Sequence, residues 1–249
     1  MDQNQFSYIG HSRHKFNNPM SETKLVQILS VLKLKPDSVV LEVGSGHGEL
    51  ARRLVHQYET EVHAVENNTY AVEEAIKLTS QNPPESHIKW IQLDANAYLS
   101  SVADGFYDAA ICIAASHALG GMEATLRQLS RVVRPGGSIL IGEGYWKKKP
   151  DPSYLGALGS EEHELLHYDA TALLGERFGL TPLWASVANE DDWDRFEWNY
   201  SLSIEEYCQE HPDDPNVKEM QSKICDWRRT YLTWGRETLG FGLFLYRNV

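Results

Sequence analysis

The sequence predicts an α/β protein with a mostly parallel central sheet and helices on both faces. Short β-prone runs alternate with helical periodicities between residues 38 and 144. A helix between two strands forms a crossover connection, which joins strands that run parallel. The β-prone runs are also apolar along most of their length, which is typical of strands buried on both faces. These two observations together predict the fold class.

Seven segments are expected to form the strands of this sheet. Most are rich in β-branched, aromatic or other apolar residues. The segments are residues 38–43, 61–66, 87–93, 107–114, 138–144, 180–188 and 239–247.

Helices are expected between the strands, where apolar residues recur at spacings of three and four. Ser21 is expected to cap the first of them. Ser203 with Glu206 has the spacing of a capping box, and Asp214 before Pro215 indicates another helix start. The predicted helices cover residues 21–32, 48–58, 69–80, 122–133, 169–178 and most of 190–237.

Three stretches are expected to lack regular structure. The first 20 residues are polar and show no periodicity. Residues 134–137 ("RPGG") and 150–152 contain proline or glycine in combinations that favour turns.

The composition excludes several classes of function. A chain of 249 residues, 42% hydrophobic and 23% charged, suffices for one sizeable globular core. A net charge of −12 argues against a nucleic-acid partner, since backbone binding requires basic patches. No apolar run is long enough for a membrane span, and the N-terminus has no apolar signal. We therefore expect a cytoplasmic protein with no nucleic-acid or membrane partner.

The cysteines do not indicate a disulfide framework or a metal site. Cys112, Cys208 and Cys225 share no CxxC spacing, and three cysteines cannot all pair. Cys112 lies inside an apolar run and is expected to be a small buried residue. No metal is expected.

A glycine-rich turn directly follows the first predicted strand in "VVLEVGSGHGEL", residues 39–50. A dinucleotide-binding turn has its third glycine three residues after the second, but Gly48 stands one place early. A phosphate-binding P-loop ends in Lys followed by Ser or Thr, and no such pair follows here. What remains is an acid, Glu42, two residues before a turn with three glycines.

This arrangement resembles motif I of the class I S-adenosylmethionine-dependent methyltransferases. Acids end the second and third predicted strands, at Glu66 and Asp94, and "RVVRPGGSILIGEG" surrounds the fifth. Other segments resemble a group of bacterial small-molecule methyltransferases of uncertain substrate. These segments are "NPMS" (18–21), "ASHALGG" (115–121), "GYW" (144–146) and "YLTWGRETLGFGLF" (231–244), so the resemblance covers nearly the whole chain.

The resemblance implies an enzyme with a Rossmann-like seven-stranded sheet whose last strand is antiparallel. It also implies S-adenosyl-L-methionine as cofactor and a small-molecule substrate. The chain is then one methyltransferase domain with a helical insertion before its last strand. Its expected parts are an N-terminal lid and helix (1–36), a cofactor-binding core (37–144), the rest of the sheet (145–189), a helical substrate cap (190–238) and a final strand (239–249).

The same resemblance assigns residues to the cofactor. The glycines let backbone amides approach its methionine part closely. Glu42 is expected to face the cofactor's ammonium or accept from the amides of the turn, and Glu66 to accept from the ribose hydroxyls. Asp94 and its neighbours correspond to the adenine contacts. The full set is Glu42, Gly44, Ser45, Gly46, Gly48, Glu66, Asn67, Asp94, Ala95, Asn96, Ala114 and Ala115.

Candidates for catalysis and substrate binding come from several separate segments of the chain. His117, just after the fourth strand, is the candidate base if the acceptor atom carries a proton. The aromatic stretch 191–200 is rich in acids and suits an aromatic or cationic molecule, whereas Arg228, Arg229 and Arg236 suit a carboxylate. The candidate substrate residues are His11, His14, Tyr145, Trp146, Trp193, Trp198, Tyr200 and Arg236.

Three functions remain open at this point. The first is methyl transfer to a small molecule, at O or N, by in-line displacement. The second is methyl transfer to a protein or RNA, and the third is a cofactor-binding sensor without catalysis. Purely structural roles are also open for some of these residues. Asp94 can cap a turn, Glu66 can begin a helix, and the apolar stripe from Val217 to Trp234 can serve helix packing. The sequence does not indicate an oligomeric state.

Overall fold

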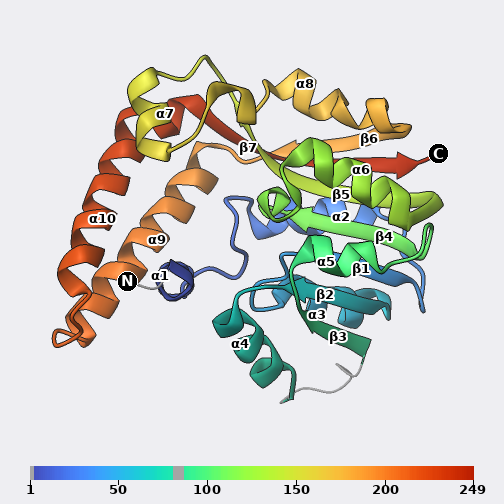
Figure 1. The fold of residues 1–249 in the computed structure, drawn as a ribbon, viewed down its shortest axis with the longest axis horizontal. Helices are drawn as coiled ribbons and strands as arrows, with labels where there is room; N and C mark the ends of the chain where they lie inside the picture. Colours follow the sequence, from blue (N-terminus) through green and yellow to red (C-terminus); the bar gives the residue numbers. More distant parts are fainter. Residues whose placement is uncertain (1–2, 81–86) are drawn as a thin grey trace. The chain divides into compact units, whose positions relative to one another are not determined.

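The computed structural model describes residues 3–80 and 87–249, and its centre is a seven-stranded sheet (Figure 1). The strand order is β3-β2-β1-β4-β5-β7-β6. Four of the strand pairs, β1 with β2, β1 with β4, β2 with β3 and β4 with β5, are parallel, and β6 with β7 is antiparallel. The strands are β1 (Val39–Val43), β2 (Glu61–Glu66), β3 (Ile88–Gln92), β4 (Tyr107–Ile113), β5 (Val133–Trp146), β6 (Leu180–Val187) and β7 (Leu239–Asn248). The predicted fold class is confirmed.

The chain divides into two compact units. The first, called the sheet unit, comprises Glu22–Glu143, Asp169–Val187 and Gly242–Val249. The second, called the helical unit, comprises Met1–Ser21, Gly144–Tyr168 and Ala188–Phe241. The helical unit thus combines the N-terminal segment with the helices that precede the last strand.

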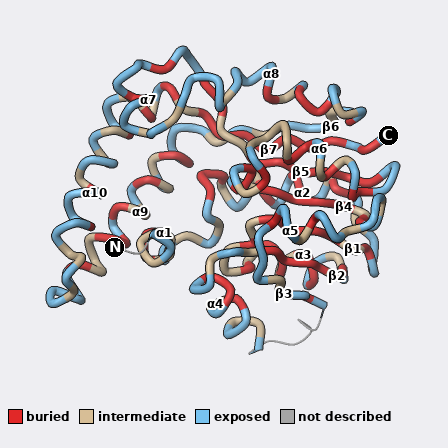
Figure 2. The backbone as a smooth tube through the Cα atoms, viewed as in Figure 1, coloured by how far each residue is buried: buried red, intermediate tan, exposed pale blue. Residues whose placement is uncertain are grey.

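Helices cover the strands of the sheet unit. In Figure 1, α5 and α6 lie in front of the strands, while α2 and α3 lie behind them. The central strands are buried, as the red tubes in Figure 2 show, and Leu41 and Ile111 have no exposed surface. The helices are α2 (Glu22–Val31), α3 (Glu49–Tyr58), α4 (Thr69–Ser80), α5 (Ala95–Ser100), α6 (Met122–Val132) and α8 (Tyr168–Leu173), with 3₁₀ turns at Ser116–Leu119 and Leu174–Phe178.

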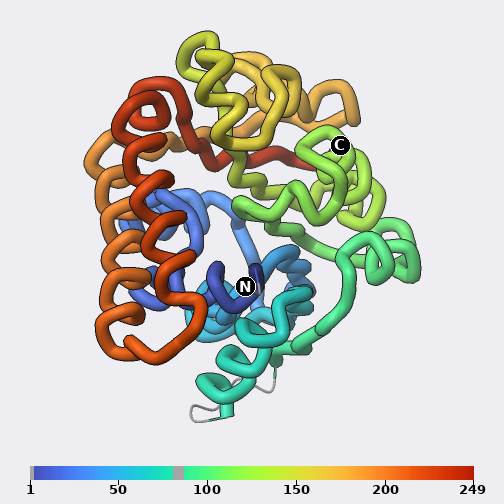
Figure 3. The backbone as a smooth tube through the Cα atoms, turned by 60° about the vertical axis from the view of Figure 1, so that its left-hand side comes forward, coloured from blue at the N-terminus to red at the C-terminus, as the bar shows by residue number. Residues whose placement is uncertain are grey.

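Two long helices, side by side, organise the helical unit (Figure 3). They are α9 (Glu190–Glu210) and α10 (Val217–Thr230), and α1 (Gln3–Gly10) packs against α9. A small apolar core of Ile9, Ile204, Cys208, Met220 and Ile224 joins the three. The unit also contains α7 (Pro152–Leu158), a 3₁₀ turn at Glu162–Glu164, a π-helical turn at Tyr231–Gly235 and α11 (Arg236–Thr238).

The prediction that the first 20 residues are irregular is wrong, because residues 3–10 form α1. This helix depends on its tertiary contact: a side chain at Gly10 would place its Cβ 2.3 Å from Cε2 of Tyr200. A glycine at a helix end therefore permits close packing that local periodicity does not reveal. Similarly, the turn predicted at residues 150–152 leads into a helix, because Asp151 caps α7 and Pro152 is its first residue.

The turn predicted at residues 134–137 lies inside β5, so that prediction is also wrong. Tyr107 of β4 pairs with Val133, but Ala109 pairs with Ser138, so extra residues on β5 leave the ladder. Gly136 has φ of 78° there. The turn residues therefore form a bulge within a continuous strand rather than its border.

Two predicted helix starts are misplaced. Ser203 and Glu206 lie within α9, whose capping box is Asn189 with Asp192. The helix α10 begins at Val217, and Asp214 instead accepts a 2.8 Å hydrogen bond from the backbone N–H of Asn216. The helix predicted at 169–178 is α8 followed by a 3₁₀ turn. The capping box of α9 thus begins 14 residues before the predicted one, while α10 begins two residues after Pro215.

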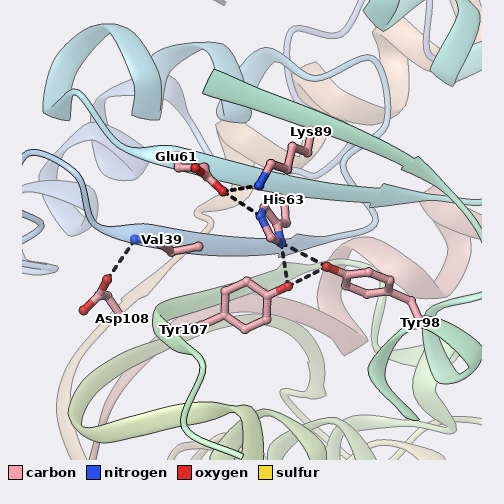
Figure 4. A network of polar contacts seen from close by, with 7 residues as sticks. All are labelled: Val39, Glu61, His63, Lys89, Tyr98, Tyr107 and Asp108. Atoms are coloured by element: carbon pink, nitrogen blue, oxygen red, sulfur yellow. Dashed lines mark hydrogen bonds and ion pairs between the residues drawn. The ribbon is translucent and has the colours of Figure 1, made fainter. Parts of the chain in front are cut away.

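A polar network centred on the buried residues His63 and Tyr107 joins β2, β3, β4 and α5 (Figure 4). His63 contacts the hydroxyls of Tyr98 and Tyr107 through Nδ1, at 3.0 and 2.9 Å, and Glu61 through Nε2 at 2.9 Å. The Nζ of Lys89 donates to Glu61 at 2.6 Å. Because each group has a partner, the network stabilises the strand register, and we assign it a structural role.

Candidate active site

The strand order reverses direction between β1 and β4, whose carboxyl ends lie side by side. The chain runs from β1 outward to β2 and β3, then returns to the other side of β1 as β4. In open α/β sheets, ligands bind outside the strand ends at such a reversal. The segments that follow β1, β2, β3 and β4 therefore form the candidate ligand site, and all of them belong to the sheet unit.

The turn after β1 requires glycine for both conformation and space. Gly44, Gly46 and Gly48 all have positive φ, at 74°, 53° and 78°. A Cβ on Gly44 would lie only 2.2 Å from the Cβ of Ala115, in the segment after β4. The N–H of Gly44 also donates to the carbonyl of Val65 at 2.9 Å. The turn is therefore held between its two neighbouring strands.

The early third glycine has a packing role. Gly48 precedes α3 as its N-cap residue, and a Cβ there would lie 2.1 Å from Cη2 of Trp90 on β3. The indole occupies the space that a side chain at residue 48 would need. The one-residue difference from a dinucleotide turn therefore brings α3 close to an aromatic side chain of the third strand.

Glu66, at the end of β2, ties two turns together. Its Oε2 accepts from the N–H of Gly46 at 2.9 Å. Its Oε1 accepts from the N–H groups of Asn67 and Asn68, at 2.9 and 2.8 Å. A carboxylate offers about four lone-pair sites, so three backbone donors leave capacity for one more hydrogen bond. Glu66 thus positions the glycine turn, and one acceptor site remains for a ligand hydroxyl.

Glu42 is the buried acid of the site, with 5% of its surface exposed. Its Oε2 has no hydrogen-bond partner among the described residues, and neither has the hydroxyl of Ser45 in the turn. Burial, together with the nearby charge of Glu66, raises the pKa of Glu42 to about 8, while Arg52 opposes the shift. A bound positive charge or hydrogen-bond donor would reverse this penalty.

The residues after β3 already have structural partners. Asp94 caps α5, where its Oδ1 accepts from the N–H of Ala97 at 2.9 Å. Asn96 donates to the carbonyl of Ala118 at 2.9 Å and accepts from Gln128 at 2.8 Å. The capping role considered for Asp94 is thus present. Its side chain is also exposed, so capping leaves its second oxygen available.

The segment after β4 carries a strained residue and the candidate base. Ala114 has φ of 56°, a conformation that costs a non-glycine residue about 1–2 kcal/mol. Such strain is concentrated at functional sites. Ala115 is buried beside Gly44, and the 3₁₀ turn then presents His117 as an exposed residue. His117 therefore lies on the segment that follows β4, as predicted.

The helical unit contains a cavity of about 730 Å³. It brings together two of the predicted substrate residues, His11 and Tyr200. His14 lies beside it, with its ring stacked on Phe196 at a centroid distance of 4.4 Å. The lining residues are Gln3, Phe6, His11, Asn17, Ala157, Phe196, Glu197, Tyr200, Lys223, Ile224, Asp226, Trp227 and Thr230.

Two of the predicted substrate residues pack inside the helical unit. Tyr145 fills the space beside Gly240, where a Cβ would lie 2.3 Å from its ring. Trp146 is buried and donates to the carbonyl of Glu162 at 2.9 Å.

Three further predicted substrate residues do not line the cavity. Trp193 is buried and stacked on Tyr231. Trp198 is 49% exposed, and Arg236 is paired with Asp194.

Most of the cavity residues were not predicted from the sequence, and three of them, Phe6, Trp227 and Glu197, matter for its chemistry. Phe6 lies on α1, which was not expected to be a helix. Trp227 was interpreted only as part of an apolar stripe. Glu197 stands between two aromatic residues in "RFEWNY", and a single acid in such a run was the signal that could have identified it.

Among the described residues there is no cluster of His, Cys, Asp and Glu that could hold a metal ion. The same part of the chain contains no helix that is both long and apolar enough to cross a membrane.

Comparison with known proteins identifies the class. Residues 40–137 match a family described as a methyltransferase domain, and they include the glycine turn, Glu66 and Ala114. A methyltransferase from Geobacter sulfurreducens, solved with S-adenosyl-L-homocysteine, is similar in structure (TM-score 0.88, 27% identity, 97% of each chain). Residues 40–137 are thus a methyltransferase domain, and the chain as a whole shares its fold with S-adenosylmethionine-dependent methyltransferases.

Within this class, the similarity extends over nearly the whole chain. YjhP of Escherichia coli (strain K12), an uncharacterized protein, is 26% identical over 98% of both chains. A methyltransferase from Thiobacillus denitrificans, also solved with S-adenosyl-L-homocysteine, has a TM-score of 0.87 and 27% identity over 99% of each chain. The resemblance to a bacterial group of uncertain substrate is confirmed.

S-adenosylmethionine is the cofactor, and the site's residues fit it. Three glycines in left-handed conformation clear the turn of side chains. Glu42 and Ser45 bring buried polar atoms that have no partner within the described chain. Two neighbouring carboxylates, Glu42 and Glu66, suit a ligand that carries a sulfonium and an ammonium rather than a pyrophosphate.

Proposed function

We propose that the enzyme transfers a methyl group to an oxygen or nitrogen atom of a small molecule. The observation that carries this proposal is the 730 Å³ cavity of the helical unit. Pockets for small molecules have volumes of about 300–1,000 Å³ and combine apolar walls with a few polar groups. The net charge of −12 further disfavours an RNA substrate. The cytoplasmic location stays a prediction.

We further propose how the residues of the sheet unit divide the work. Glu42 and the backbone of the glycine turn hold the amino-acid part of the cofactor, and Glu66 holds its ribose. The remaining cofactor contacts are assigned to Asn67, Asp94, Ala95, Asn96, Ala114 and Ala115. When bound, S-adenosylmethionine supplies an electrophilic methyl group on a sulfonium, which departs as a neutral thioether. The chain's task is then to align the acceptor and exclude water.

The test is a methylation assay of the purified protein with radiolabelled methyl donor. We expect label transfer to members of a small-molecule library that contains amines, phenols and alcohols, and none to total RNA or to a protein extract. Label in RNA or protein alone would overturn the proposal in favour of a macromolecular substrate. Tight cofactor binding with no transfer to any of the three would instead indicate a sensor.

His117 is proposed as the base that accepts the acceptor's proton. We expect His117→Gln to lower kcat by about 100-fold, the usual contribution of a positioned base, because glutamine cannot take up a proton. Binding of S-adenosylhomocysteine, measured by calorimetry, should stay within about twofold of wild type. His87→Gln, in the segment that leads into β3, is the matched control and should leave kcat unchanged. A kcat within a few-fold of wild type for His117→Gln would contradict the role.

A further inference from the structure

The cavity of the helical unit combines aromatic walls with one buried carboxyl group. Phe6, Phe196, Tyr200 and Trp227 line it, and they come from α1, α9 and α10. Glu197, between Phe196 and Trp198 on α9, is 8% exposed and lines the same cavity. Aromatic faces and a carboxylate together attract positive charge, because the ring faces are the negative ends of their quadrupoles.

Glu197 is held in place but not neutralised. Its Oε2 accepts from Nε1 of Trp227 at 2.6 Å, a neutral donor. Burial raises the pKa of Glu197 to about 7, against the opposing effect of that hydrogen bond. A buried carboxylate with only a neutral partner is costly unless a positive charge joins it. Keeping the Glu197 carboxylate ionised therefore costs free energy, and a bound cationic ligand would offset that cost.

Two of the three arginines that could bind a carboxylate, Arg228 and Arg236, are already engaged with acids. Arg236 pairs with Asp194 and Arg228 pairs with Glu205, at 3.0 and 2.7 Å. Neither arginine lines the cavity. The sequence left open whether these arginines bind a carboxylate or the acidic aromatic stretch binds a cation. Because the two arginines are occupied by acids, these ion pairs favour a cationic ligand over a carboxylate.

Lys223 is the one lysine or arginine among the described lining residues, and its position fits the same chemistry. Its Nζ pairs with Glu219 at 2.9 Å and lies 5.8 Å from the centroid of the Phe6 ring. An ammonium thus already lies over an aromatic wall of this cavity, with its charge compensated by Glu219. Asp226, also in the lining, adds a second acid.

We propose that this cavity binds a small organic cation, with its positive group between the Glu197 carboxylate and the aromatic side chains. Where the bound cation is identified as the methyl acceptor, the inference rests on the proposed function. An ammonium has no lone pair, so the cationic group anchors the ligand, and a different atom of the same molecule receives the methyl group.

Binding of three probes of similar size tests the proposal without any methyl donor. The probes are benzyltrimethylammonium, whose charge does not titrate, neutral 2-phenylethanol and anionic phenylacetate. Calorimetry on the full chain at pH 8 should rank the ammonium at least about tenfold tighter than the alcohol, with the anion weakest. Equal affinities, or tightest binding of phenylacetate, would overturn the proposal.

Glu197→Gln assigns the effect to the carboxylate. Glutamine keeps the shape and can still accept from Trp227, so we expect the fold to persist, as measured by thermal unfolding. Affinity for benzyltrimethylammonium should fall about tenfold, while that for 2-phenylethanol changes by less than about twofold. Glu206→Gln is the matched control, because Glu206 lies on α9 outside the cavity and pairs with Arg13. Unchanged binding of the ammonium to Glu197→Gln would contradict the role of Glu197.

The cavity wall offers an independent test. Phe6→Leu removes an aromatic face and leaves an apolar side chain, so the ammonium should lose affinity while the alcohol loses little. A parallel loss for both probes would show that the wall acts through shape alone and would contradict the cation site. If the protein binds cations in this way yet methylates nothing in the library, the cavity assignment stands and the proposed function fails. If it methylates only neutral or acidic acceptors and shows no preference for the ammonium, the proposed function stands and the cation-binding assignment of the cavity fails.

Discussion

Gly44→Ala is expected to lower methyl transfer by about a hundredfold and to weaken cofactor binding, because the turn must move by about 1 Å or more. The new Cβ would lie 2.2 Å from the Cβ of Ala115, at a separation that no side-chain rotation relieves. The residue also has φ of 74°, which costs alanine about 1–2 kcal/mol. Calorimetric titration with S-adenosylhomocysteine and a kinetic assay would measure both effects.

A substitution at a second glycine, Gly159, distinguishes the effect of backbone strain from that of steric clash. Gly159 follows α7 with φ of 65°, but a Cβ there has nothing within 4 Å. Gly159→Ala should therefore cost about 1–2 kcal/mol of stability and leave cofactor affinity unchanged. If Gly44→Ala binds S-adenosylhomocysteine as tightly as Gly159→Ala does, the proposed position of the cofactor at this turn is wrong.

Glu42→Gln is expected to change the pH dependence of stability in the ligand-free protein. Folding raises the pKa of Glu42 from 4.5 to about 8 through burial, so the folded chain holds this proton more tightly than the unfolded chain. The contribution of Glu42 to the free energy of unfolding is therefore greatest below its pKa in the unfolded chain. It declines as the pH rises toward its pKa in the folded chain. The decline amounts to the order of 3–5 kcal/mol, and glutamine should abolish it.

Urea unfolding at pH 5, 6.5 and 8 would measure this difference. The gap between Glu42→Gln and wild type should shift in favour of the variant with rising pH, while its affinity for the cofactor falls because the carboxylate is lost. Glu73→Gln, at an exposed position on α4, is the control and should leave the pH dependence as in wild type. Parallel stability curves for Glu42→Gln and wild type would show that Glu42 does not titrate in this way.

The sheet and the motif that indicates the cofactor were predictable because their signals are local. Each βα unit of the first half carries its own strand run, turn residues and helical period, and these match the observed β1 to β4 within about one residue at each border. The motif from Glu42 to Gly48 and the acid at Glu66 depend on spacing along the chain, which the sequence displays directly.

The cavity could not be predicted because it depends on contacts between distant segments. Phe6 approaches Tyr200 and Lys223 only after α1 has packed on α9 and α10. Trp146 and Arg236 were also expected at the substrate, because of their place in a motif and their charge. Their hydrogen bonds and ion pairs, to the Glu162 carbonyl and to Asp194, exist only in the folded helical unit.

Glu66 has a further consequence for how this protein can change over evolutionary time. The carboxylate that we assign to the ribose also accepts from three backbone N–H groups in two different turns. A mutation that removes it alters donor recognition and the scaffold of the glycine turn together. A descendant of this protein that abandoned methyl transfer would therefore still be under selection to keep an acid at residue 66, for the sake of its fold alone.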